Sequence, residues 1–372
     1  MRCDVLVVGA GPSGSMTAKI LAEEGVDVIL IEQKKEIGYP VQCAEGVNKF
    51  LFRDTGIKKD PSFIEQRIDG TVIYFHNEEY VLTGEQWKGY TLDRRRFDKF
   101  LAENAQHAGA KILTSARAIG LKKRESGWIV KIKLSGKPME IETKIIVGAD
   151  GFRKSVGKWA GLAKEWRTDE YSKCLQYTVP CQDMQEKNKF HIVFDENFPS
   201  GYGWIFPKRC KVNIGVGVSP KSNVKKALQY FLKHPITKQL VGDNVVINEI
   251  RGGKIPTCGP KSKDEVVGDG IIIVGDAAGM VEPVTGEGIA PSMISGISAG
   301  ETIAEAIERK SWSKSMLSIY YKNCMRKRYI GSTVGESMGY FLELKRKIYD
   351  VFSEKSTPEE RKKFVIENLM SF

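Results

Sequence analysis

Cysteine and histidine are scarce in this chain of 372 residues, and their spacing excludes two classes of site. The seven cysteines are an odd number and none is part of a CxxC pair, so neither a disulfide framework nor a thiolate zinc site is expected. The four histidines are scattered singly along the chain, and we predict no metal site. The N-terminus runs directly into an apolar strand without a secretory signal, and reduced thiols fit a cytoplasmic protein.

The chain also has few long apolar runs, and fewer acidic than basic residues. No apolar stretch is long enough to span a bilayer, so no transmembrane helix is expected. Lys and Arg outnumber Asp and Glu by 57 to 46, which gives a net charge of +11. A basic surface suits an anionic membrane or an acidic partner, but it also serves solubility alone. We expect no nucleic-acid partner. The length favours about two domains.

What the chain does have is a glycine-rich turn between a strand and a helix. The apolar run Asp4–Val8 precedes Gly9, Gly11 and Gly14, and a helical segment from Ser13 follows. A second strand then ends at Glu32. This order is the dinucleotide-binding fingerprint: the glycines allow a tight turn and a close approach to a pyrophosphate, and the acidic residue binds ribose hydroxyls. Glu32 disfavours a 2′-phosphate, so NADP is not expected here, but this unit alone does not separate NAD from FAD.

Two acidic turns favour FAD. One strand ends at Asp150, and another ends at Asp276 ahead of the Gly-Glu-Gly-Ile turn that contains Gly288 and Ile289. A carboxylate at the end of such a strand lies beside a sugar alcohol of an extended cofactor. The helix that starts at this turn, expected over about 288–310, would stabilise an anionic reduced flavin through its N-terminus.

The remaining pattern predicts an α/β protein with interleaved domains. We expect strands within 64–92, a helix over 94–109, a β-meander over 111–147, and β-rich sequence over 171–255 with one helix near 221–234. The resulting fold is a Rossmann-like FAD-binding domain interleaved with an antiparallel-sheet substrate domain, plus C-terminal helices. The expected FAD-binding domain comprises 1–60, 93–170 and 265–310. The substrate domain comprises 61–92 and 171–264, and the C-terminal helical region 311–372.

These segments resemble the glutathione-reductase-type flavoproteins, in the branch that contains aromatic hydroxylases. Arg94, three residues before Phe97-Asp98, matches the arginine of that branch, whereas the sequence after Ser155 lacks its second arginine. Two motifs are similar to the geranylgeranyl reductase family, especially its archaeal digeranylgeranylglycerophospholipid reductases. One is Pro40-Val-Gln-Cys43, and the other is the aromatic segment from Pro199 to Pro207. The resemblance covers about 1–310 and implies further cofactor contacts at Cys43, Ala44, Gly46, Arg94 and Ala118.

The aromatic segment also has a physical interpretation of its own. Strand alternation places Tyr202, Trp204 and Phe206 on one face, where three rings would form an apolar wall for a polyprenyl chain. An ordinary aromatic core strand is the alternative, and a small buried hydrophobe is the alternative for Cys43. With the resemblance, we expect Tyr202, Trp204 and Phe206 to bind substrate, and Cys43, Tyr202 and Trp204 to be catalytic. The Cys43 thiol could donate a proton or protect the flavin from oxidation.

The resemblance implies an FAD-dependent reductase that saturates isolated C=C bonds of geranylgeranyl chains in archaeal membrane ether phospholipids or their precursors. The hydride would come from N5 of the reduced flavin and the proton from Cys43 or water. Ferredoxin or a nicotinamide cofactor would supply electrons. Arg326–Arg328 with Tyr320, Tyr321 and Tyr329 suggest a peripheral membrane patch, or else a solvated helix face. The alternatives are a flavin monooxygenase of an aromatic or polyketide substrate, and a lipid carrier that retains FAD.

Overall fold

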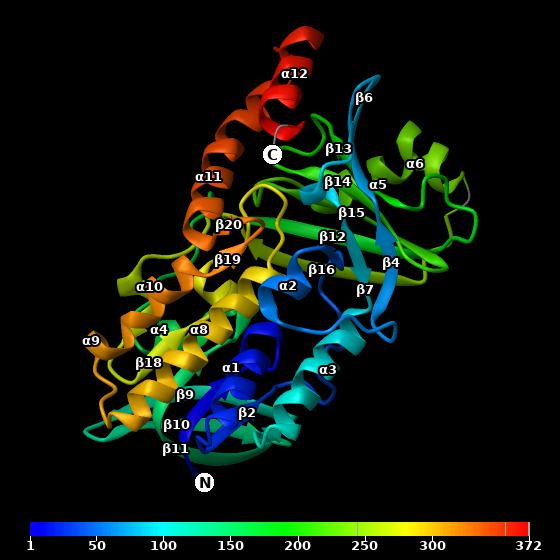
Figure 1. Ribbon diagram of the computed structural model, residues 1–372. Coiled ribbons are helices and arrows are strands. Elements are labelled where there is room, and N and C mark those ends of the chain that lie inside the picture. The colour runs from blue at the N-terminus through cyan, green and yellow to red at the C-terminus, as the bar shows by residue number, and fades with distance from the viewer. Residues whose placement is uncertain (244, 354, 371–372) are drawn as a thin grey trace. The chain divides into compact units, whose positions relative to one another are not determined.

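The chain passes back and forth between two folding units, each assembled from three stretches of sequence. The computed structural model describes residues 1–243, 245–353 and 355–370 (Figure 1). Unit 1 comprises Met1–Pro40, Arg95–Trp166 and Cys258–Met338, and unit 2 comprises Val41–Arg94, Arg167–Thr257 and Gly339–Phe372. The sequence predicts that 41–60 belong to the FAD-binding domain. Those residues fold with unit 2, because the strand at Gly46–Asn48 pairs with the strand at Gly89–Leu92.

Unit 1 is built on a sheet with the strand order β17-β18-β11-β1-β2-β8, which is parallel from β18 to β8 and has β17 antiparallel at its edge. Its strands are β1 (Arg2–Val8), β2 (Val28–Ile31), β8 (Lys111–Leu113), β9 (Ala116–Arg124), β10 (Gly127–Leu134), β11 (Lys137–Gly148), β17 (Val267–Gly268), β18 (Ile271–Ile273) and the pair β19 (Arg328–Tyr329) and β20 (Ser332–Thr333). Strand β1 lies between β11 and β2, parallel to both. Such a strand is buried on both faces, which explains the continuous apolar run that begins the chain.

Helices connect and cover these strands. They are α1 (Pro12–Glu23), α3 (Arg94–His107), α4 (Ser155–Trp159), α7 (Lys263–Val266), α8 (Ile289–Glu308), α9 (Lys314–Leu317) and α10 (Ile319–Arg326), with 3-10 turns η2 (Gly151–Arg153) and η3 (Gly275–Ala278). Helix α1 starts with Pro12 in its first turn and is followed by Gly25 in a left-handed conformation, which is common just after a helix. The meander prediction was wrong for β8, which pairs in parallel with β2, whereas β9, β10 and β11 do form an antiparallel meander.

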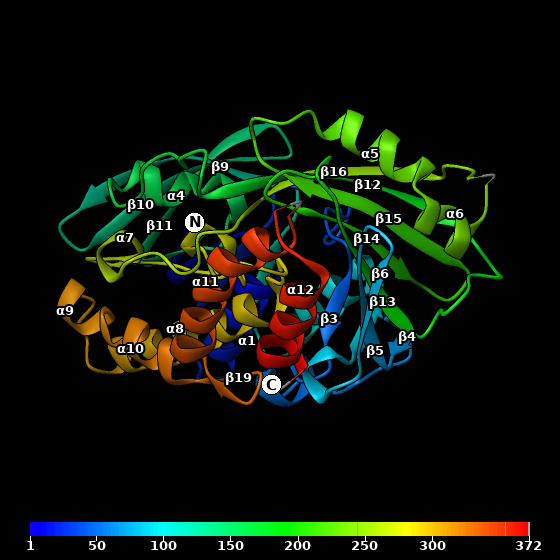
Figure 2. The same ribbon diagram turned by 90° about the horizontal axis from the view of Figure 1, so that it is seen from above.

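Helices α1 and α8 lie side by side in both views (Figures 1 and 2). A Cβ atom on Gly296 of α8 would come within 2.2 Å of the Ser13 carbonyl oxygen, and the Thr17 hydroxyl donates to the Gly296 carbonyl at 3.0 Å. The two helices therefore touch backbone to backbone. This contact joins the N-terminal βαβ segment to a helix nearly three hundred residues further along the chain.

Unit 2 contains a seven-stranded sheet with the order β16-β12-β15-β14-β13-β5-β6, and a small sheet with the order β3-β7-β4. The strands are β3 (Gly46–Asn48), β4 (Ile64–Ile68), β5 (Gly70–Phe75), β6 (Glu78–Leu82), β7 (Gly89–Leu92), β12 (Tyr171–Pro180), β13 (Lys189–Phe194), β14 (Tyr202–Pro207), β15 (Lys211–Val218) and β16 (Glu249–Pro256). Most neighbours in the large sheet are antiparallel, as expected, but β5 and β13 pair in parallel. The short helices α2 (Leu51–Thr55) and η1 (Glu85–Trp87) also belong to this unit.

One face of the large sheet is covered by α5 (Val224–Lys233) and α6 (Pro235–Val241). Ile214, Val216 and Ile205 pack with Phe231 in the core on this side. Figure 2 shows α5 and α6 beside the strands of this sheet. The sequence predicted one helix here, whereas the structure has two. Pro235 begins the second helix and His234 caps it by accepting the Ile236 amide N–H at 3.2 Å, which interrupts the first helix.

The C-terminal helices are divided between the units. The sequence predicts a separate helical region over 311–372, but residues up to Met338 fold with unit 1. Helix α11 (Val334–Val351) runs on into unit 2, where α12 (Pro358–Val365) and the π-helical turn η4 (Ile366–Met370) follow. Two bonds from Arg361 to Glu78, of 2.7 and 2.6 Å, fasten α12 to β6. Among the described residues, no helix has both the length and the apolarity required to cross a membrane.

Candidate functional site

The glycine-rich turn of unit 1 is shaped by two close backbone approaches and one open position. A Cβ atom on Gly9, whose φ is +108°, would lie 2.3 Å from the Ala149 carbonyl oxygen, and one on Gly14 would lie 1.9 Å from the Gly9 carbonyl oxygen. No atom lies within 4 Å of the corresponding position on Gly11. Gly9 and Gly14 are therefore glycines for packing, whereas Gly11 leaves backbone exposed at the helix N-terminus, where a phosphate binds favourably.

Glu32 is fixed at the end of β2 by both of its carboxylate oxygens. The Ala10 amide donates to one oxygen at 3.0 Å and the Lys34 amide to the other at 2.9 Å. Each oxygen keeps a lone pair for a further hydroxyl donor. Strand β9 starts beside this residue, since the Ala116 amide donates to the Glu32 carbonyl at 2.8 Å, and Ala118 lies two residues along that strand.

The third part of this group comes from η3 and the start of α8. A Cβ atom on Gly275 would come within 2.6 Å of the Ser13 hydroxyl, and one on Gly288 within 3.4 Å of an Asp276 carboxylate oxygen. Ile289 is the first residue of α8. The cofactor residues predicted in unit 1 therefore do come together, from the start of α1, the end of β2 and the start of α8.

A row of four residues crosses the large sheet of unit 2. Arg251 on β16 lies opposite Gln176 on β12, Gln176 lies opposite Gly215 on β15, and Gly215 lies opposite Trp204 on β14. Because Gly215 has no side chain, the indole covers it: a Cβ atom there would be 2.3 Å from the Trp204 ring. The indole N–H thereby reaches the Gln176 amide oxygen, to which it donates at 2.9 Å.

The prediction that Tyr202, Trp204 and Phe206 share one face is confirmed. Ring centroids are 6.1 Å apart for Tyr202 and Trp204, and 6.5 Å apart for Trp204 and Phe206. The ring of Phe206 also packs on Phe190 at 4.5 Å and closely over Gly46, where a Cβ atom would lie 2.8 Å from it. The rings face away from the core beneath α5 and α6.

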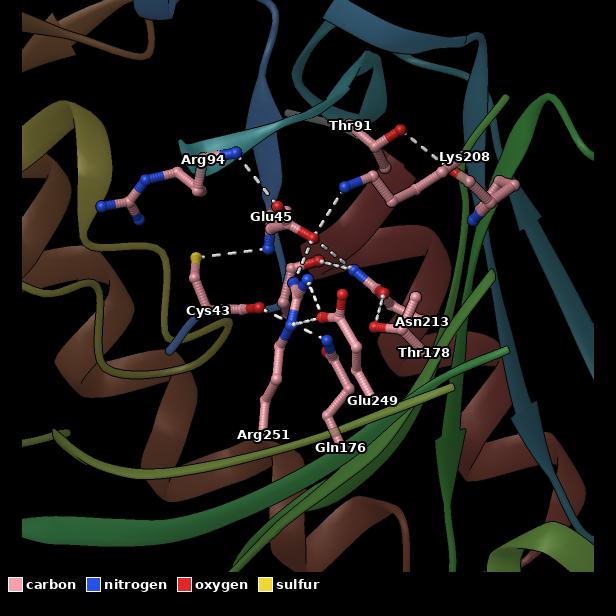
Figure 3. Close-up of polar contacts among 12 residues, drawn as sticks. Cys43, Glu45, Thr91, Arg94, Gln176, Thr178, Lys208, Asn213, Glu249 and Arg251 are labelled. Carbon is pink, nitrogen blue, oxygen red and sulfur yellow. Dashed lines mark hydrogen bonds and ion pairs between the residues drawn. The ribbon is translucent and has the colours of Figure 1, made fainter. Parts of the chain in front are cut away.

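The loop at Cys43 is attached to this same face of the sheet (Figure 3). The Gln176 amide nitrogen donates to the Cys43 carbonyl at 3.4 Å, and the Asn213 amide nitrogen donates to the Ala44 carbonyl at 3.0 Å. The Glu45 backbone N–H points at the Cys43 sulfur, 3.2 Å away. Burial raises the pKa of the Cys43 thiol, and the Arg94 guanidinium opposes this only in part. Cys43 is therefore a neutral thiol at neutral pH.

Glu45 is a buried carboxylate surrounded by donors. One oxygen accepts hydrogen bonds from Lys208 at 2.7 Å, Arg251 at 2.8 Å and Asn213 at 2.9 Å, and the other accepts the Arg94 amide at 3.0 Å. Burial favours the protonated form, but the two cations outweigh it and hold the pKa of Glu45 below its ordinary value. Glu45 is therefore ionised, although its residue is only 1% exposed.

Comparison with known proteins places this chain in a family. The family described as FAD binding domain matches residues 2–327. The digeranylgeranylglycerophospholipid reductase of Methanocaldococcus jannaschii is 37% identical over 331 residues, which cover 88% of this chain and 83% of that protein. Digeranylgeranylglycerophospholipid reductase 2 of Methanopyrus kandleri is 37% identical over 370 residues, with 96% and 89% covered. This chain belongs to the digeranylgeranylglycerophospholipid reductase family. It is an FAD-dependent oxidoreductase by that membership.

A solved structure agrees with this assignment. The crystal structure of a geranylgeranyl bacteriochlorophyll reductase-like protein from Thermoplasma acidophilum matches with a TM-score of 0.85 and 30% identity, over 99% of this chain and 96% of that one. The likeness extends over both units of the fold. It also includes the C-terminal helices, which lie outside the part that carried the sequence resemblance.

Residues of unit 1 fit the FAD that this family binds. Besides the open position at Gly11, Asp150 presents a buried acceptor: its Oδ2 accepts the Val156 amide at 3.1 Å, whereas Oδ1 has no hydrogen-bond partner in the described part of the chain. Burial raises the pKa of Asp150. A hydroxyl donor on an extended cofactor would satisfy such an oxygen.

The C-terminal aromatic patch proposed from the sequence is wrong for two of its three rings. Tyr320 and Tyr329 are 2% and 1% exposed, and the Tyr320 hydroxyl donates to the Ile273 carbonyl at 3.1 Å. Lys327 forms an ion pair with Glu301 at 2.9 Å. The Tyr320 ring is buried because helix α10 packs on α8, which periodicity over so short a helix did not reveal. Tyr329 lies beyond this helix, on β19.

Sequence reasoning also missed the charged residues around Cys43. Glu45 lies inside the Cys43–Gly46 segment, where the predicted cofactor contacts are Cys43, Ala44 and Gly46. Asn213 is a polar residue within an otherwise apolar strand. A buried polar residue in such a strand is a usable signal, because it needs partners. No pattern in the sequence around Lys208 or Arg251 predicts that these residues belong to the cluster.

Proposed function

We propose that this protein is an FAD-dependent reductase that saturates isolated C=C bonds of geranylgeranyl chains in archaeal ether phospholipids or their precursors. The observation that carries the proposal is the Gln176 amide, which bonds to Trp204 on one side and to the Cys43 carbonyl on the other. Trp204 and Cys43 belong to the two motifs typical of geranylgeranyl reductases. Their attachment to one side chain supports a shared role.

The chemistry assigns different tasks to these residues. An isolated alkene has no carbonyl to activate it, so the protein must hold it in place and exclude water. When bound and reduced, FAD supplies the hydride equivalent. Tyr202, Trp204 and Phe206 offer aromatic surface for a prenyl chain, and the neutral Cys43 thiol can donate the proton that completes the reduction.

We assign the cofactor to Gly9, Gly11, Ser13, Gly14, Glu32, Ala118, Asp276, Gly288 and Ile289 of unit 1. The family motifs also predict cofactor contacts at Cys43, Ala44, Gly46 and Arg94. This assignment rests on the family motifs and on the open turn and unsatisfied acceptor of unit 1. The electron donor is either ferredoxin or a nicotinamide cofactor, and the net charge of +11 suits both an acidic donor protein and peripheral contact with an anionic lipid surface.

The test is anaerobic turnover of the FAD-loaded protein. The enzyme is reduced with dithionite and mixed with a digeranylgeranylglycerophospholipid, and the lipid is analysed by mass spectrometry. We expect mass increases corresponding to successive additions of two hydrogen atoms, with reoxidation of the flavin. An unchanged lipid mass would contradict the proposal.

Two other outcomes identify the alternatives. Incorporation of one oxygen atom into an aromatic substrate, with oxygen consumed at the expense of NADPH, would indicate a monooxygenase. Lipid that co-purifies with the protein, without flavin reoxidation when more lipid is added, would indicate a carrier.

A further inference from the structure

Glu45 has every polar group engaged within unit 2. Its carboxylate accepts four hydrogen bonds, its backbone N–H points at the Cys43 sulfur, and its carbonyl accepts the Leu92 amide at 2.8 Å. Its φ is +70°, in the left-handed region that side chains other than glycine rarely adopt. Surroundings that hold a residue in such a conformation, with a buried charge, point to a functional constraint.

The charges around Glu45 nearly cancel. Lys208 lies 2.7 Å from the Glu45 carboxylate and is itself buried, 4% exposed. Arg251 lies 2.8 Å from the same oxygen and is shared with Glu249, 2.5 Å away. Two cations therefore face two carboxylates. Removing the buried charge of Glu45 or of Lys208 leaves a net charge close to Cys43.

The Cys43 thiol responds to this balance. The charged and titratable groups that act on it are Arg94, which favours the thiolate, Glu45, and the neighbouring thiol of Cys174. The backbone N–H of Glu45 favours the thiolate, whereas the negative charge of its carboxylate favours the thiol. Burial raises the pKa of Cys174 to about 12, so this neighbour is neutral too. Of these groups, Arg94 and Glu45 are ionised and both bond to the cysteine, Arg94 through its side chain and Glu45 through its backbone N–H.

We propose that Glu45 is a positioning residue for Cys43: its buried carboxylate anchors the turn to Lys208, Asn213 and Arg251, and its negative charge keeps the neighbouring thiol protonated. The role deepens the proposed function and rests on it, because a protonated thiol is what a proton donor to the alkene requires. In this arrangement Lys208 and Arg251 stabilise the ionised carboxylate of Glu45. The negative charge of that carboxylate offsets the two cations, so that they do not stabilise a Cys43 thiolate.

The test measures the protonation of Cys43 without any substrate. The oxidised FAD-loaded protein is alkylated with iodoacetamide across a range of pH, and the peptide that contains Cys43 is quantified by mass spectrometry. Alkylation follows the thiolate fraction, so a lower thiol pKa gives a faster reaction at a fixed pH below that pKa. The measurement is independent of prenyl turnover, so failure of the proposed function and failure of this inference remain distinguishable.

Two variants with opposite expected signs separate charge from packing. Glu45→Gln keeps the size but removes the negative charge, and we expect Cys43 to react roughly threefold faster or more at about pH 8. Lys208→Met removes a cation and leaves the Glu45 charge less compensated, and we expect slower alkylation than in the wild type. The double variant Glu45→Gln/Lys208→Met restores the balance and should return towards the wild-type rate.

The control is Glu249→Gln. Glu249 also binds Arg251, but its side chain is 53% exposed and it does not contact the Cys43 loop, so solvent screens its charge and the alkylation rate should not change. If Glu45→Gln and Lys208→Met both accelerate alkylation, the cluster only packs the loop and the charge role is overturned. Unchanged rates in both variants, or slower alkylation in Glu45→Gln, would overturn it as well. Lys208→Met alone decides the sign if Glu45→Gln fails to fold.

Discussion

The indole N–H of Trp204 donates to the amide oxygen of Gln176 at 2.9 Å, and both side chains are buried, at 6% and 3% exposure. Gly215 makes the bond possible, because any side chain at that position would occupy the space of the indole. The same amide reaches the Cys43 carbonyl with its nitrogen. One glutamine thus determines both how the tryptophan lies on the sheet and where the loop is held.

A double-mutant cycle tests this bond. Trp204→Phe leaves the Gln176 oxygen without its donor, and Gln176→Leu leaves the indole N–H without its acceptor, so each should lower the free energy of unfolding by about 1–3 kcal/mol. The double variant should lose less than the sum of the two, because no buried group of this pair is then left unpaired. Denaturant unfolding measures all four proteins. Strict additivity would show that the bond contributes nothing.

Two variants of the glycine-rich turn distinguish an effect on FAD binding from an effect on folding. Gly11→Ala adds a methyl group to open space, and the backbone there has φ −75°, which alanine adopts easily. We expect its apoprotein to keep the wild-type melting temperature while the Kd for FAD rises about tenfold or more. Gly14→Ala, with its Cβ 1.9 Å from a carbonyl oxygen, should melt at a lower temperature even without FAD. Fluorescence titration and thermal melts distinguish the two, and unchanged FAD affinity in Gly11→Ala would remove the turn from the cofactor site.

Loss of the Cys43 thiol should affect turnover more than cofactor binding. We expect Cys43→Ala to slow alkene reduction by about a hundredfold or more, since a hundredfold is the lower end of the usual general-acid contribution. The change in FAD affinity should be much smaller. Cys174→Ala removes a neighbouring buried thiol and serves as the matched control. Because burial raises the pKa of Cys43, its proton is available at neutral pH and is lost as pH rises through that raised pKa. Wild-type turnover should therefore decline on the alkaline side, and a rate limited to acidic pH would exclude the thiol as the proton source.

The attachment of α12 should show a characteristic acid dependence. The hydrogen bonds from Arg361 hold the pKa of Glu78 below its ordinary value of 4.5. The stability from this pair is therefore present above about pH 4.5 and is lost as pH falls through the lowered folded-state pKa. Glu78→Gln should be less stable than the wild type by roughly 1–3 kcal/mol at neutral pH, and the difference should shrink in acid.

Glu79→Gln is the control for that experiment, since Glu79 follows on the same strand with its side chain exposed. Chemical denaturation at several pH values gives the comparison. A Glu78→Gln deficit that stays constant down to low pH would mean that the carboxylate charge is not what holds α12.

Local patterns were enough to predict the parts of this fold that depend on neighbouring residues. The segment from β1 to Glu32, the helix that begins at Ile289 and the shared face of Tyr202, Trp204 and Phe206 follow from spacing within a short window. The cluster around Glu45 does not. Its partners Lys208 and Arg251 lie about 160 and 200 residues away, and only the pairing of β16, β12, β15 and β14 brings them together. Buried charge pairs carry no periodic signal.

The contact between α1 and α8 has a consequence for biosynthesis. The nucleotide fingerprint is complete once the first thirty or so residues have left the ribosome, yet Ser13 is packed by a helix that begins at Ile289. Strand β1 likewise pairs with β11, and β11 in turn with β18 at Ile271–Ile273. During most of translation, the glycine-rich turn of the nascent chain therefore lacks the helix that packs against it. We expect the chain to acquire its yellow colour only after residue 308 has emerged, when the last helix that supports the turn can close on it.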